Sequence, residues 1–255
     1  MTDGLNPTSD EPITVVTGAG SGMGRAVAQA LLARGQSVLL TGRRRQALDE
    51  TAADAVGGSA VIVAADLSTV EGADAVLASP GGRSVAAVVA AAGGQGDFKR
   101  PAQSSAAADA AWLAALRMNL FTAVLPIEAV LGRFVDGGRI VLIGSTAGLD
   151  GQGGPYATAK AALAGYGRDL ARRAASRGIT VNTLAPGFVA DTNFFEAGGY
   201  GPVTPMIDRA SQQTLLGKVG RCADVVAAVE WLLGDGGRWM TGQTISVNGG
   251  TVMVQ

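Results

Sequence analysis

The chain has 255 residues, of which 47% are hydrophobic and 16% charged, with a formal net charge of −1, one cysteine and no histidine. This length suits one α/β domain with a sizeable core, and the absence of a basic excess argues against nucleic acid or an anionic membrane as partner. A single cysteine excludes an internal disulfide framework and fits a reducing cytoplasm, and the lack of a Cys/His cluster argues against a catalytic zinc site.

The N-terminal residues 1–11 are polar, and we expect them to form a flexible tail ahead of a single domain at 12–255. They contain neither the cationic start nor the apolar segment of a secretion signal. We find no uninterrupted apolar run of the ~18 residues that a membrane span needs. The expectation is therefore a cytoplasmic protein.

Short apolar runs alternate with longer alanine-rich segments along the rest of the chain. Near-continuous apolar runs predict strands buried on both faces of a parallel sheet, and their alternation with helices predicts βαβ units. The predicted strands cover residues 13–17, 37–41, 60–64, 85–91, 139–144, 179–184 and 243–248. The predicted helices cover residues 23–34, 45–55, 108–131, 155–177 and 222–234.

A glycine-rich loop, TGAGSGMG, follows the first predicted strand and runs from Thr17 to Gly24. Gly18, Gly22 and Gly24 let the backbone turn tightly and approach a ligand. The helix after the loop offers free N–H groups and the positive end of its dipole to a pyrophosphate. A plain strand-to-helix turn is the alternative, but the strand–loop–helix context favours a dinucleotide site.

The end of the second predicted strand bears on which dinucleotide binds. NAD sites place a carboxylate here for the ribose 2′-hydroxyl, whereas this chain has TGRRR from Thr41 to Arg45. Arg43 or Arg44 can meet a 2′-phosphate with paired hydrogen bonds, which favours NADP; alternatively, both simply face solvent. After the third strand, Asp66 lies where an adenine amino group would be in reach, or it caps a helix.

The segment YATAK places Tyr156 and Lys160 four residues apart, on one face of a predicted helix. A free tyrosine has a pKa of about 10, too high for an efficient base at neutral pH. A nearby lysine cation and the positive ring of an oxidised nicotinamide both favour the phenolate. Tyr156 can then exchange a proton with a carbonyl or alcohol in place of histidine, and Ser145, in the loop after the fifth strand, can hydrogen-bond the same substrate oxygen.

The stretch 188–218 differs from the other loops because it is long and rich in aromatic and other apolar residues. Long loops in compact domains are often functional, so we expect a flexible lid over the site. Its apolar character predicts a mainly hydrophobic substrate.

A few other distinctive residues have less specific interpretations. Gln95 and Gln152 either reach the substrate or serve as polar groups of their loops. Cys222 is expected to be inert at the start of a helix. Packing in the core or at an interface is expected of Trp112, Trp231 and Trp239.

Together, these motifs resemble the short-chain dehydrogenase/reductase family in its compact single-domain form, over residues 12–250. The glycine loop resembles the family's cofactor loop, and YATAK its active-site Tyr-x-x-x-Lys. VNTLAPGF (181–188) resembles the stretch beside the nicotinamide, and TGQTISVNGG (241–250) the closing strand. The resemblance implies a doubly wound, mostly parallel seven-stranded Rossmann-type sheet with its site at the carboxyl ends of the strands. It also implies hydride transfer between NAD(P) and a carbonyl or secondary alcohol.

The resemblance further implies roles for individual residues. Asn119, in WLAALRMNL (112–120), would be a fourth catalytic residue that holds a water linking Lys160 to solvent. Lys160 would also bind the nicotinamide ribose, and the helices at 108–131 and 155–177 would build the interface of a homotetramer or homodimer. The implied cofactor-binding residues are Gly18, Ser21, Gly22, Met23, Gly24, Arg43, Asp66, Leu67, Ala92, Gly93, Tyr156, Lys160, Pro186, Gly187, Val189 and Thr192.

The chain departs from the family pattern in four places, of which the mildest is Met23 in place of the more usual Ile or Leu. Residues 90–93 read AAAG where the family usually has Asn-Asn-Ala-Gly, so other groups must satisfy the end of the sheet. Ser145 and Tyr156 are closer in sequence than is usual, which requires a tighter loop and leaves Thr146 as an alternative to Ser145. The threonine that often touches the cofactor comes one place late, as Thr192.

We therefore predict an NADP-preferring oxidoreductase acting on a hydrophobic carbonyl or secondary alcohol, such as a 3-oxoacyl thioester or a steroid. The alternatives are an NAD-dependent secondary-alcohol dehydrogenase and a cofactor-binding regulatory protein without turnover. A sugar-nucleotide epimerase or dehydratase would need further C-terminal sequence, and the Tyr/Lys pair disfavours flavin binding.

Overall fold

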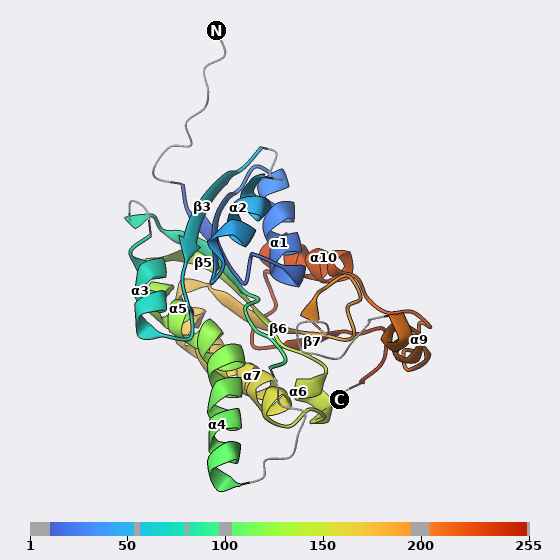
Figure 1. Ribbon diagram of the computed structural model, residues 1–255. Helices are drawn as coiled ribbons and strands as arrows, with labels where there is room; N and C mark the ends of the chain where they lie inside the picture. The colour runs from blue at the N-terminus through green and yellow to red at the C-terminus, as the bar shows by residue number, and fades with distance from the viewer. Residues whose placement is uncertain (1–10, 54–56, 80–81, 97–103, 195–203, 254–255) are drawn as a thin grey trace.

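A computed structural model describes residues 11–53, 57–79, 82–96, 104–194 and 204–253 of the chain. It shows a seven-stranded parallel sheet in the order β3-β2-β1-β4-β5-β6-β7, with helices on both faces (Figure 1). The strands are β1 (Ile13–Thr17), β2 (Ser37–Gly42), β3 (Ser59–Ala64), β4 (Val85–Ala90), β5 (Phe134–Ile143), β6 (Thr180–Pro186) and β7 (Thr244–Val247).

All seven predicted strands are present, and their side chains alternate between two cores. In β1, Val15 belongs to the core on one face of the sheet and Val16 to the core on the other. Burial on both faces explains why these strands are apolar at nearly every position. Strand β5 begins earlier than predicted, at Phe134, because the glycines at 137 and 138 interrupt the apolar pattern by which a strand is recognised.

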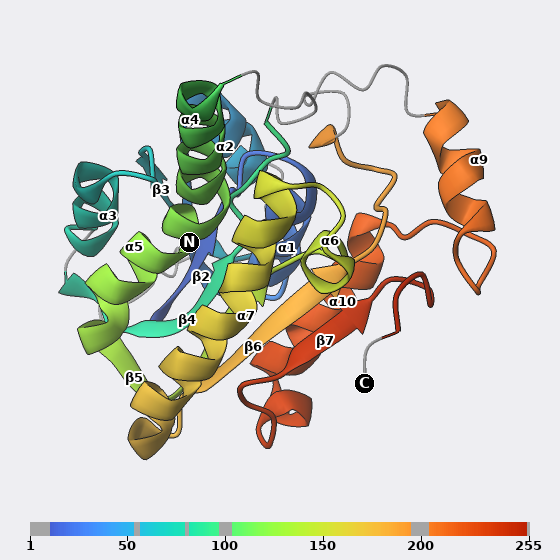
Figure 2. The same ribbon diagram turned by 90° about the horizontal axis from the view of Figure 1, so that it is seen from below.

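Helices cover both faces of the sheet. The core on one face is completed by α1, α2 and α10, and the core on the other by α3, α5 and α7 (Figures 1 and 2). The α-helices are α1 (Gly22–Ala33), α2 (Arg45–Ala53), α3 (Val70–Leu77), α4 (Ser105–Leu116), α5 (Thr122–Val130), α6 (Ala147–Asp150), α7 (Pro155–Ala174), α9 (Thr204–Gln212) and α10 (Cys222–Leu233). The other helical turns are π-helical η2 (Arg117–Phe121) and the 3-10 turns η3 (Leu131–Arg133), η4 (Ala175–Arg177) and η5 (Asp235–Gly237).

The structure contains two helices of eight or more residues, α3 and α9, that the sequence pattern did not predict. Helix α3 has only eight residues and contains Gly72, so its helical signal is weak; Thr69 caps it by accepting a hydrogen bond from the Gly72 N–H. Helix α9 lies within the predicted lid at 188–218, of which residues 195–203 are outside the described part of the chain. The predicted tail is likewise outside it, apart from residue 11.

The predicted helix at 108–131 is interrupted rather than continuous. The π-helical turn η2 separates α4 from α5, and Pro126 lies inside α5. A proline has no N–H and so removes one hydrogen bond from the helix ladder. The bulge brings Asn119 into the interior, where its side chain is fully buried.

This helical stretch also corrects the expectation about membrane spans. Residues Ser105–Arg133 are long and apolar enough to cross a membrane by length and composition, with a mean hydropathy of 1.5 in an 18-residue window. The search for an uninterrupted apolar run did not find this segment, because isolated polar and charged residues interrupt it. In the fold, α5 packs against the sheet through Ala123, Ile127 and Val130. Length and composition alone are therefore weak support for a span.

The strand order reverses between β1 and β4, which are neighbours although β2 and β3 separate them in sequence. At such a switch point the loops after the two strands diverge to opposite faces and leave a crevice beyond the carboxyl ends of the strands. The glycine loop follows β1, and the AAAG segment follows β4. The candidate site is built from these two segments.

Candidate functional site

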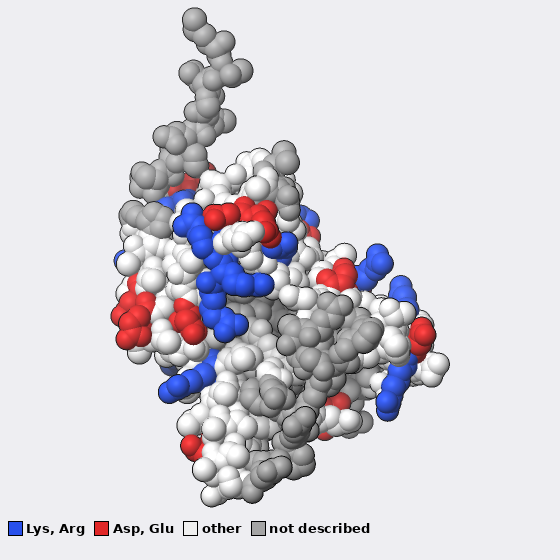
Figure 3. All heavy atoms as spheres, in the orientation of Figure 1, with Lys and Arg blue, Asp and Glu red and all other residues white. Residues whose placement is uncertain are grey.

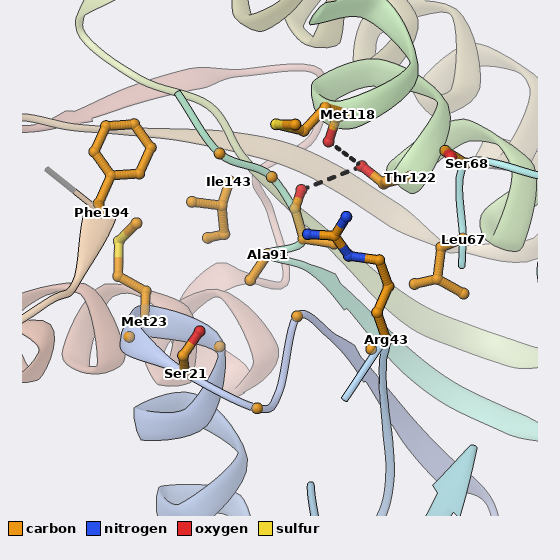
Figure 4. Close-up of a pocket in the computed structure, with 18 of the residues that line it drawn as sticks. Ser21, Met23, Arg43, Leu67, Ser68, Ala91, Met118, Thr122, Ile143 and Phe194 are labelled. Atoms are coloured by element: carbon orange, nitrogen blue, oxygen red, sulfur yellow. Dashed lines mark hydrogen bonds between the residues drawn. The ribbon is translucent and has the colours of Figure 1, made fainter. Parts of the chain in front are cut away.

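A cavity of about 590 Å³ lies at this switch point (Figure 4). It runs from the glycine loop and the end of β2 to the first turns of α7. The structure thus brings together three motifs that are far apart in sequence. Of the predicted site residues, those that line the cavity are Gly18, Ser21, Gly22, Met23, Gly24, Arg43, Asp66, Leu67, Ala92, Gly93, Tyr156, Lys160 and Thr192.

The glycine loop is shaped by contacts that exclude any side chain. Gly18 has φ +67°, and a Cβ there would lie 2.8 Å from the Cα of Ala92. A Cβ on Gly24 would overlap the carbonyl oxygen of Gly18. Ser21 precedes α1 but makes no side-chain capping hydrogen bond, so the first-turn N–H groups keep no such partner. A dinucleotide pyrophosphate fits this cradle of backbone donors.

The far end of the cavity carries positive charge. The Arg43 side chain reaches across the cavity from the end of β2 (Figure 4), and basic side chains gather on this face beside α2 (Figure 3). Arg45 pairs with Asp49, whereas within the described residues Arg43 and Arg44 form no ion pair. These two guanidinium groups are therefore available to a phosphate.

The structure decides one of the two interpretations of Asp66, the helix cap, while the adenine contact stays a prediction. Its carboxylate accepts hydrogen bonds from the N–H and the hydroxyl of Ser68, and these bonds together with the charge of Arg43 lower the pKa of the carboxyl. Thr69, rather than Asp66, caps α3. The prediction that Asp66 caps a helix is therefore wrong, while the residue does line the cavity.

Tyr156 lies in the first turn of α7, and only 8% of its surface is exposed. Its hydroxyl is hydrogen-bonded to Ser145, which lowers the pKa of the phenol, but burial raises it more. The backbone N–H of Thr146 donates to the carbonyl of Pro186. Of the two candidates, Ser145 is the one whose side chain contacts the phenol in this structure.

Lys160 is buried one turn further along α7. Its ammonium donates a hydrogen bond of 2.8 Å to the carbonyl oxygen of Ile143, and burial lowers its pKa to about 8. In this structure burial outweighs the Ser145 hydrogen bond and raises the pKa of Tyr156, and the lowering expected from the lysine cation stays a prediction. The second group that was expected to favour the phenolate, the positive nicotinamide ring, would act on the pKa of Tyr156 only when a cofactor is bound.

The AAAG segment is held by three side chains in place of the missing asparagines. Thr17 accepts a hydrogen bond from the N–H of Ala92 (3.0 Å), and Thr122 donates one to its carbonyl (3.2 Å). The Oδ1 of Asn119 accepts the N–H of Gly94 (3.0 Å). Neither Thr17 nor Thr122 was predicted for this role. For Thr17, a threonine at the end of an otherwise apolar strand was a usable signal, whereas Thr122 begins helix α5 and gave none.

Five predicted site residues do not line the cavity but lie behind or beside it. Asn119 is separated from it by Gly93, where a Cβ would come within 2.8 Å of Asn119 Oδ1 and 3.2 Å of Lys160 Nζ. Pro186 ends β6 opposite Val247. Ser145 lies beside Tyr156. The N–H of Gly187 donates to the carbonyl of Val247. Val189 pairs with Gly220, and its carbonyl accepts a hydrogen bond from Thr192.

The late threonine still reaches the cofactor loop. Thr192 lines the cavity, and its methyl carbon lies 3.5 Å from the position of a Cβ on Gly22. The one-residue delay after Pro186 is thus accommodated by the turn at 189–192, in which the Thr192 hydroxyl donates to the Val189 carbonyl (3.2 Å).

Apolar side chains complete the cavity at the Tyr156 end, and two of them, Met118 and Ile143, were not among the predicted site residues. The ring of Phe194 packs on Tyr156 with centroids 5.7 Å apart. Figure 4 shows Phe194, Met23 and Ile143 on the same side, with Met118 nearby. Such a wall suits an apolar substrate chain.

Of the two glutamines considered for substrate contact, only one lines the cavity. Gln95 lines the cavity, and its Oε1 is buried without a hydrogen-bond partner among the described residues. Gln152 is exposed outside the cavity, and its N–H donates to Asp150. Of the two, only Gln95 stays a candidate for contact with the substrate.

The tryptophans and the cysteine complete the predicted set. None of the tryptophans is in the core: Trp112, Trp231 and Trp239 are 42%, 46% and 95% exposed. The core part of that prediction is wrong because these residues lie on outward faces of the fold; interface packing stays a prediction. Cys222 is buried at the start of α10, where burial and Asp191 raise its thiol pKa to about 12, in agreement with an inert side chain.

Comparison with known proteins adds independent information. Residues 18–252 match the protein family described as enoyl-(acyl carrier protein) reductase. The 3-oxoacyl-[acyl-carrier-protein] reductase FabG of Escherichia coli is 34% identical over 95% of this chain and 98% of its own. A short-chain dehydrogenase/reductase family oxidoreductase from Burkholderia thailandensis has a TM-score of 0.80 at 31% identity, covering 94% of this chain and 92% of that one. The L-sorbose reductase of Gluconobacter frateurii, solved with NADPH and L-sorbose, shares the fold with a TM-score of 0.86 at 22% identity, over 96% and 98% of the two chains.

Proposed function

Because the chain belongs to the short-chain dehydrogenase/reductase family, we propose that it is an NADPH-preferring reductase of 3-oxoacyl thioesters. The family makes it an NAD(P)-dependent oxidoreductase acting on C=O and CH–OH groups. The observation that carries the proposal is a single cavity that joins the glycine loop to the buried Tyr156 and Lys160.

The cofactor assignment is supported by the two ends of the cavity. The glycine loop and the first turn of α1 would hold the pyrophosphate, and Arg43 with Arg44 would bind the 2′-phosphate that distinguishes NADPH from NADH. Both arginines lack an ion-pair partner in the described chain, and no carboxylate follows β2 to bind a ribose 2′-hydroxyl. When bound, the nicotinamide supplies the hydride.

Proton delivery is the work of the chain's own residues. Tyr156 would donate its hydroxyl proton to the substrate oxygen as the carbonyl carbon becomes a CH–OH carbon. Ser145, already hydrogen-bonded to Tyr156, would orient the same oxygen. Lys160 would place a positive charge beneath Tyr156 and bind the ribose, and Asn119 would hold the water that returns a proton to Lys160. The burial of Tyr156 keeps bulk water from the reacting atoms.

The substrate class follows from chemistry and from the relatives. The wall of Phe194, Met118, Ile143 and Met23 is apolar and suits an acyl chain. The proteins named 3-oxoacyl-[acyl-carrier-protein] reductase match nearly the full length of this chain. A 3-oxoacyl thioester has the required carbonyl at C3, between the thioester group and the apolar remainder of the acyl chain.

The test is the rate of cofactor oxidation by purified protein, with NADPH and NADH in parallel. The panel contains 3-oxoacyl and trans-2-enoyl thioesters of equal chain length, a ketosteroid and a simple ketone. We expect turnover of the 3-oxoacyl thioester with NADPH well above every other pair. Selective turnover of the enoyl thioester or the steroid would overturn the substrate class. Cofactor binding without any turnover across the panel would favour a regulatory protein.

Self-association and location complete the proposal. Trp112, Leu113 and Phe121 expose large apolar side chains along α4 and η2, and we expect this face to pack against another copy in a homodimer or homotetramer in the cytoplasm. Light scattering on the purified protein tests this: a monomer at micromolar concentration contradicts it.

A further inference from the structure

Two side chains outside the cavity tie the glycine loop to α2. The Thr51 hydroxyl lies 2.9 Å from the carbonyl oxygens of both Ala19 and Ala47. Nη2 of Arg25 lies 2.9 Å from the carbonyl oxygen of Gly20 and 3.2 Å from that of Ala47. Two consecutive loop carbonyls, those of Ala19 and Gly20, thus lie within hydrogen-bond distance of side chains that also reach the Ala47 carbonyl of α2, and the single hydrogen of the Thr51 hydroxyl serves one of its two acceptors at a time. We call Arg25 and Thr51 the loop brace.

The contact between loop and helix is close at the backbone as well. A Cβ on Gly20 would lie 3.1 Å from the Cβ of Ala47, so the loop rests on α2 with little free space. Thr51 is fully buried. Neither member of the loop brace lines the main cavity, although Arg25 lines a neighbouring pocket together with Arg44. Thr51 lines neither, so its effect on a ligand must act through the position of the loop and α2.

The location of α2 explains why the position of the glycine loop relative to this helix matters for cofactor binding. The helix begins at Arg45, directly after Arg43 and Arg44. The glycine loop would contact the pyrophosphate, which NADPH and NADH share, whereas these arginines would contact only the 2′-phosphate of NADPH. The loop brace sets the distance between the shared contact and the discriminating one.

Stability alone does not account for the placement of Arg25. Its ion pair with Glu50 is solvent-exposed, at 32% and 52% for the two side chains, so the pair contributes little. Its Nε is buried with no hydrogen-bond partner in the described chain, which is unfavourable. The contacts that this arrangement gains are those to the loop and to α2.

We propose that the loop brace, Arg25 with Thr51, sets the preference for NADPH over NADH from outside the cofactor site, by holding the glycine loop in register with Arg43 and Arg44. The inference rests on the proposed NADPH preference. Both residues are positioning residues: paired hydrogen bonds from a guanidinium to a phosphate depend on geometry, so a small shift of α2 weakens them while the pyrophosphate contact persists.

The experiment measures the Kd of NADPH and of NADH for the purified full-length protein by fluorescence titration. Thr51→Val keeps the volume and removes the hydroxyl, and Arg25→Met keeps the aliphatic stem. We expect each to raise the Kd of NADPH by about tenfold, as loss of one positioned charge-assisted contact predicts, and to change the Kd of NADH by less than about threefold. The value of kcat at saturating NADPH should stay unchanged. Thr51→Ser should restore the wild-type preference.

Arg34→Met is the matched control, because Arg34 follows α1 and pairs with Glu230 on α10 instead of contacting the loop. It should leave both Kd values unchanged. Thermal unfolding checks that each variant is folded, and Thr51→Val carries the test if Arg25→Met does not fold.

The outcomes separate the two proposals. A wild-type protein that prefers NADPH, with loop-brace variants that weaken both cofactors equally or neither, overturns this inference alone. A wild-type protein without any NADPH preference overturns the proposed cofactor assignment and this inference with it.

Discussion

The two ends of the cavity use opposite kinds of construction. At the end proposed for the cofactor, backbone groups and exposed arginines line the cavity, and the side chains that hydrogen-bond the glycine loop from α1 and α2 do not line it. At the catalytic end, the functional groups themselves are buried: Lys160 is 6% exposed and Tyr156 8%.

This difference in construction indicates which property each end of the cavity controls. Charge recognition of a phosphate tolerates water, so the cofactor end can remain open and depend on geometry. Proton transfer depends on pKa values, which burial moves strongly, so the catalytic end depends on its interior. Changes at the cofactor end should alter binding, and changes at the catalytic end should alter turnover and its pH dependence.

The largest expected effect is at Tyr156. Tyr156→Phe keeps the ring against Phe194 and removes only the proton donor, so kcat should fall by about 10²- to 10⁴-fold while NADPH binding stays within about threefold. Steady-state kinetics and fluorescence titration measure the two quantities. Tyr166→Phe, ten residues along the same helix, removes a hydroxyl that contacts Glu128 outside the cavity and should leave kcat unchanged. Near-normal turnover of Tyr156→Phe would refute the mechanism.

The next effect is at the opposite end. Arg43→Ala combined with Arg44→Ala should weaken NADPH by about 10- to 100-fold, the range of a lost charge-assisted contact, with little change for NADH. Parallel titrations measure both. The control is Arg45→Ala, because Arg45 already pairs with Asp49 on the protein surface. Equal weakening of the two cofactors would mean that these arginines do not bind the 2′-phosphate.

The pH profile tests the buried charge. Because Lys160 has a pKa of about 8, we expect kcat/KM for carbonyl reduction to fall above that pH, by about tenfold per pH unit at the limit. Lys160→Arg stays charged in this range and should remove the decline, whatever its absolute rate. A wild-type profile that is flat to pH 9.5 would contradict the assignment.

The same shift makes a prediction about stability. The pKa of about 8 in the folded protein is below the ordinary lysine value of 10.5, so between these values the unfolded chain binds the extra proton. The contribution of Lys160 to the free energy of unfolding should therefore rise as pH increases from about 8 to 10. Denaturant titrations of the wild type and Lys160→Met measure it. A difference between the two proteins that is independent of pH would contradict the shift.

The smallest effect concerns the segment after β4. Thr17→Val leaves the N–H of Ala92 without its acceptor and should cost about 1–3 kcal/mol of unfolding free energy in urea titrations. Thr41→Val is the control, since Thr41 is equally buried and its hydroxyl has no partner within the described residues. Equal losses in both variants would show that the Ala92 contact is not what matters.

How far sequence analysis reached can be judged from single residues. The doubly wound seven-stranded sheet and the positions of the glycine loop, Tyr156 and Lys160 followed from local patterns and from the family resemblance, whereas the order of the strands came only from the structure. Helix α3 was missed because it is short and contains Gly72. The tryptophans were misplaced because aromatic character does not reveal which face of a helix meets the core.

By itself, the sequence determined the βαβ alternation, the loop after β1 and the i, i+4 pairing of Tyr156 with Lys160, because each depends only on residues close together in the chain. Only the tertiary structure decided that Ser145 contacts Tyr156, that Lys160 has a lowered pKa, and that Arg25 and Thr51 brace the glycine loop against α2. Burial and long-range hydrogen bonds are properties of packed elements, so no local pattern encodes them.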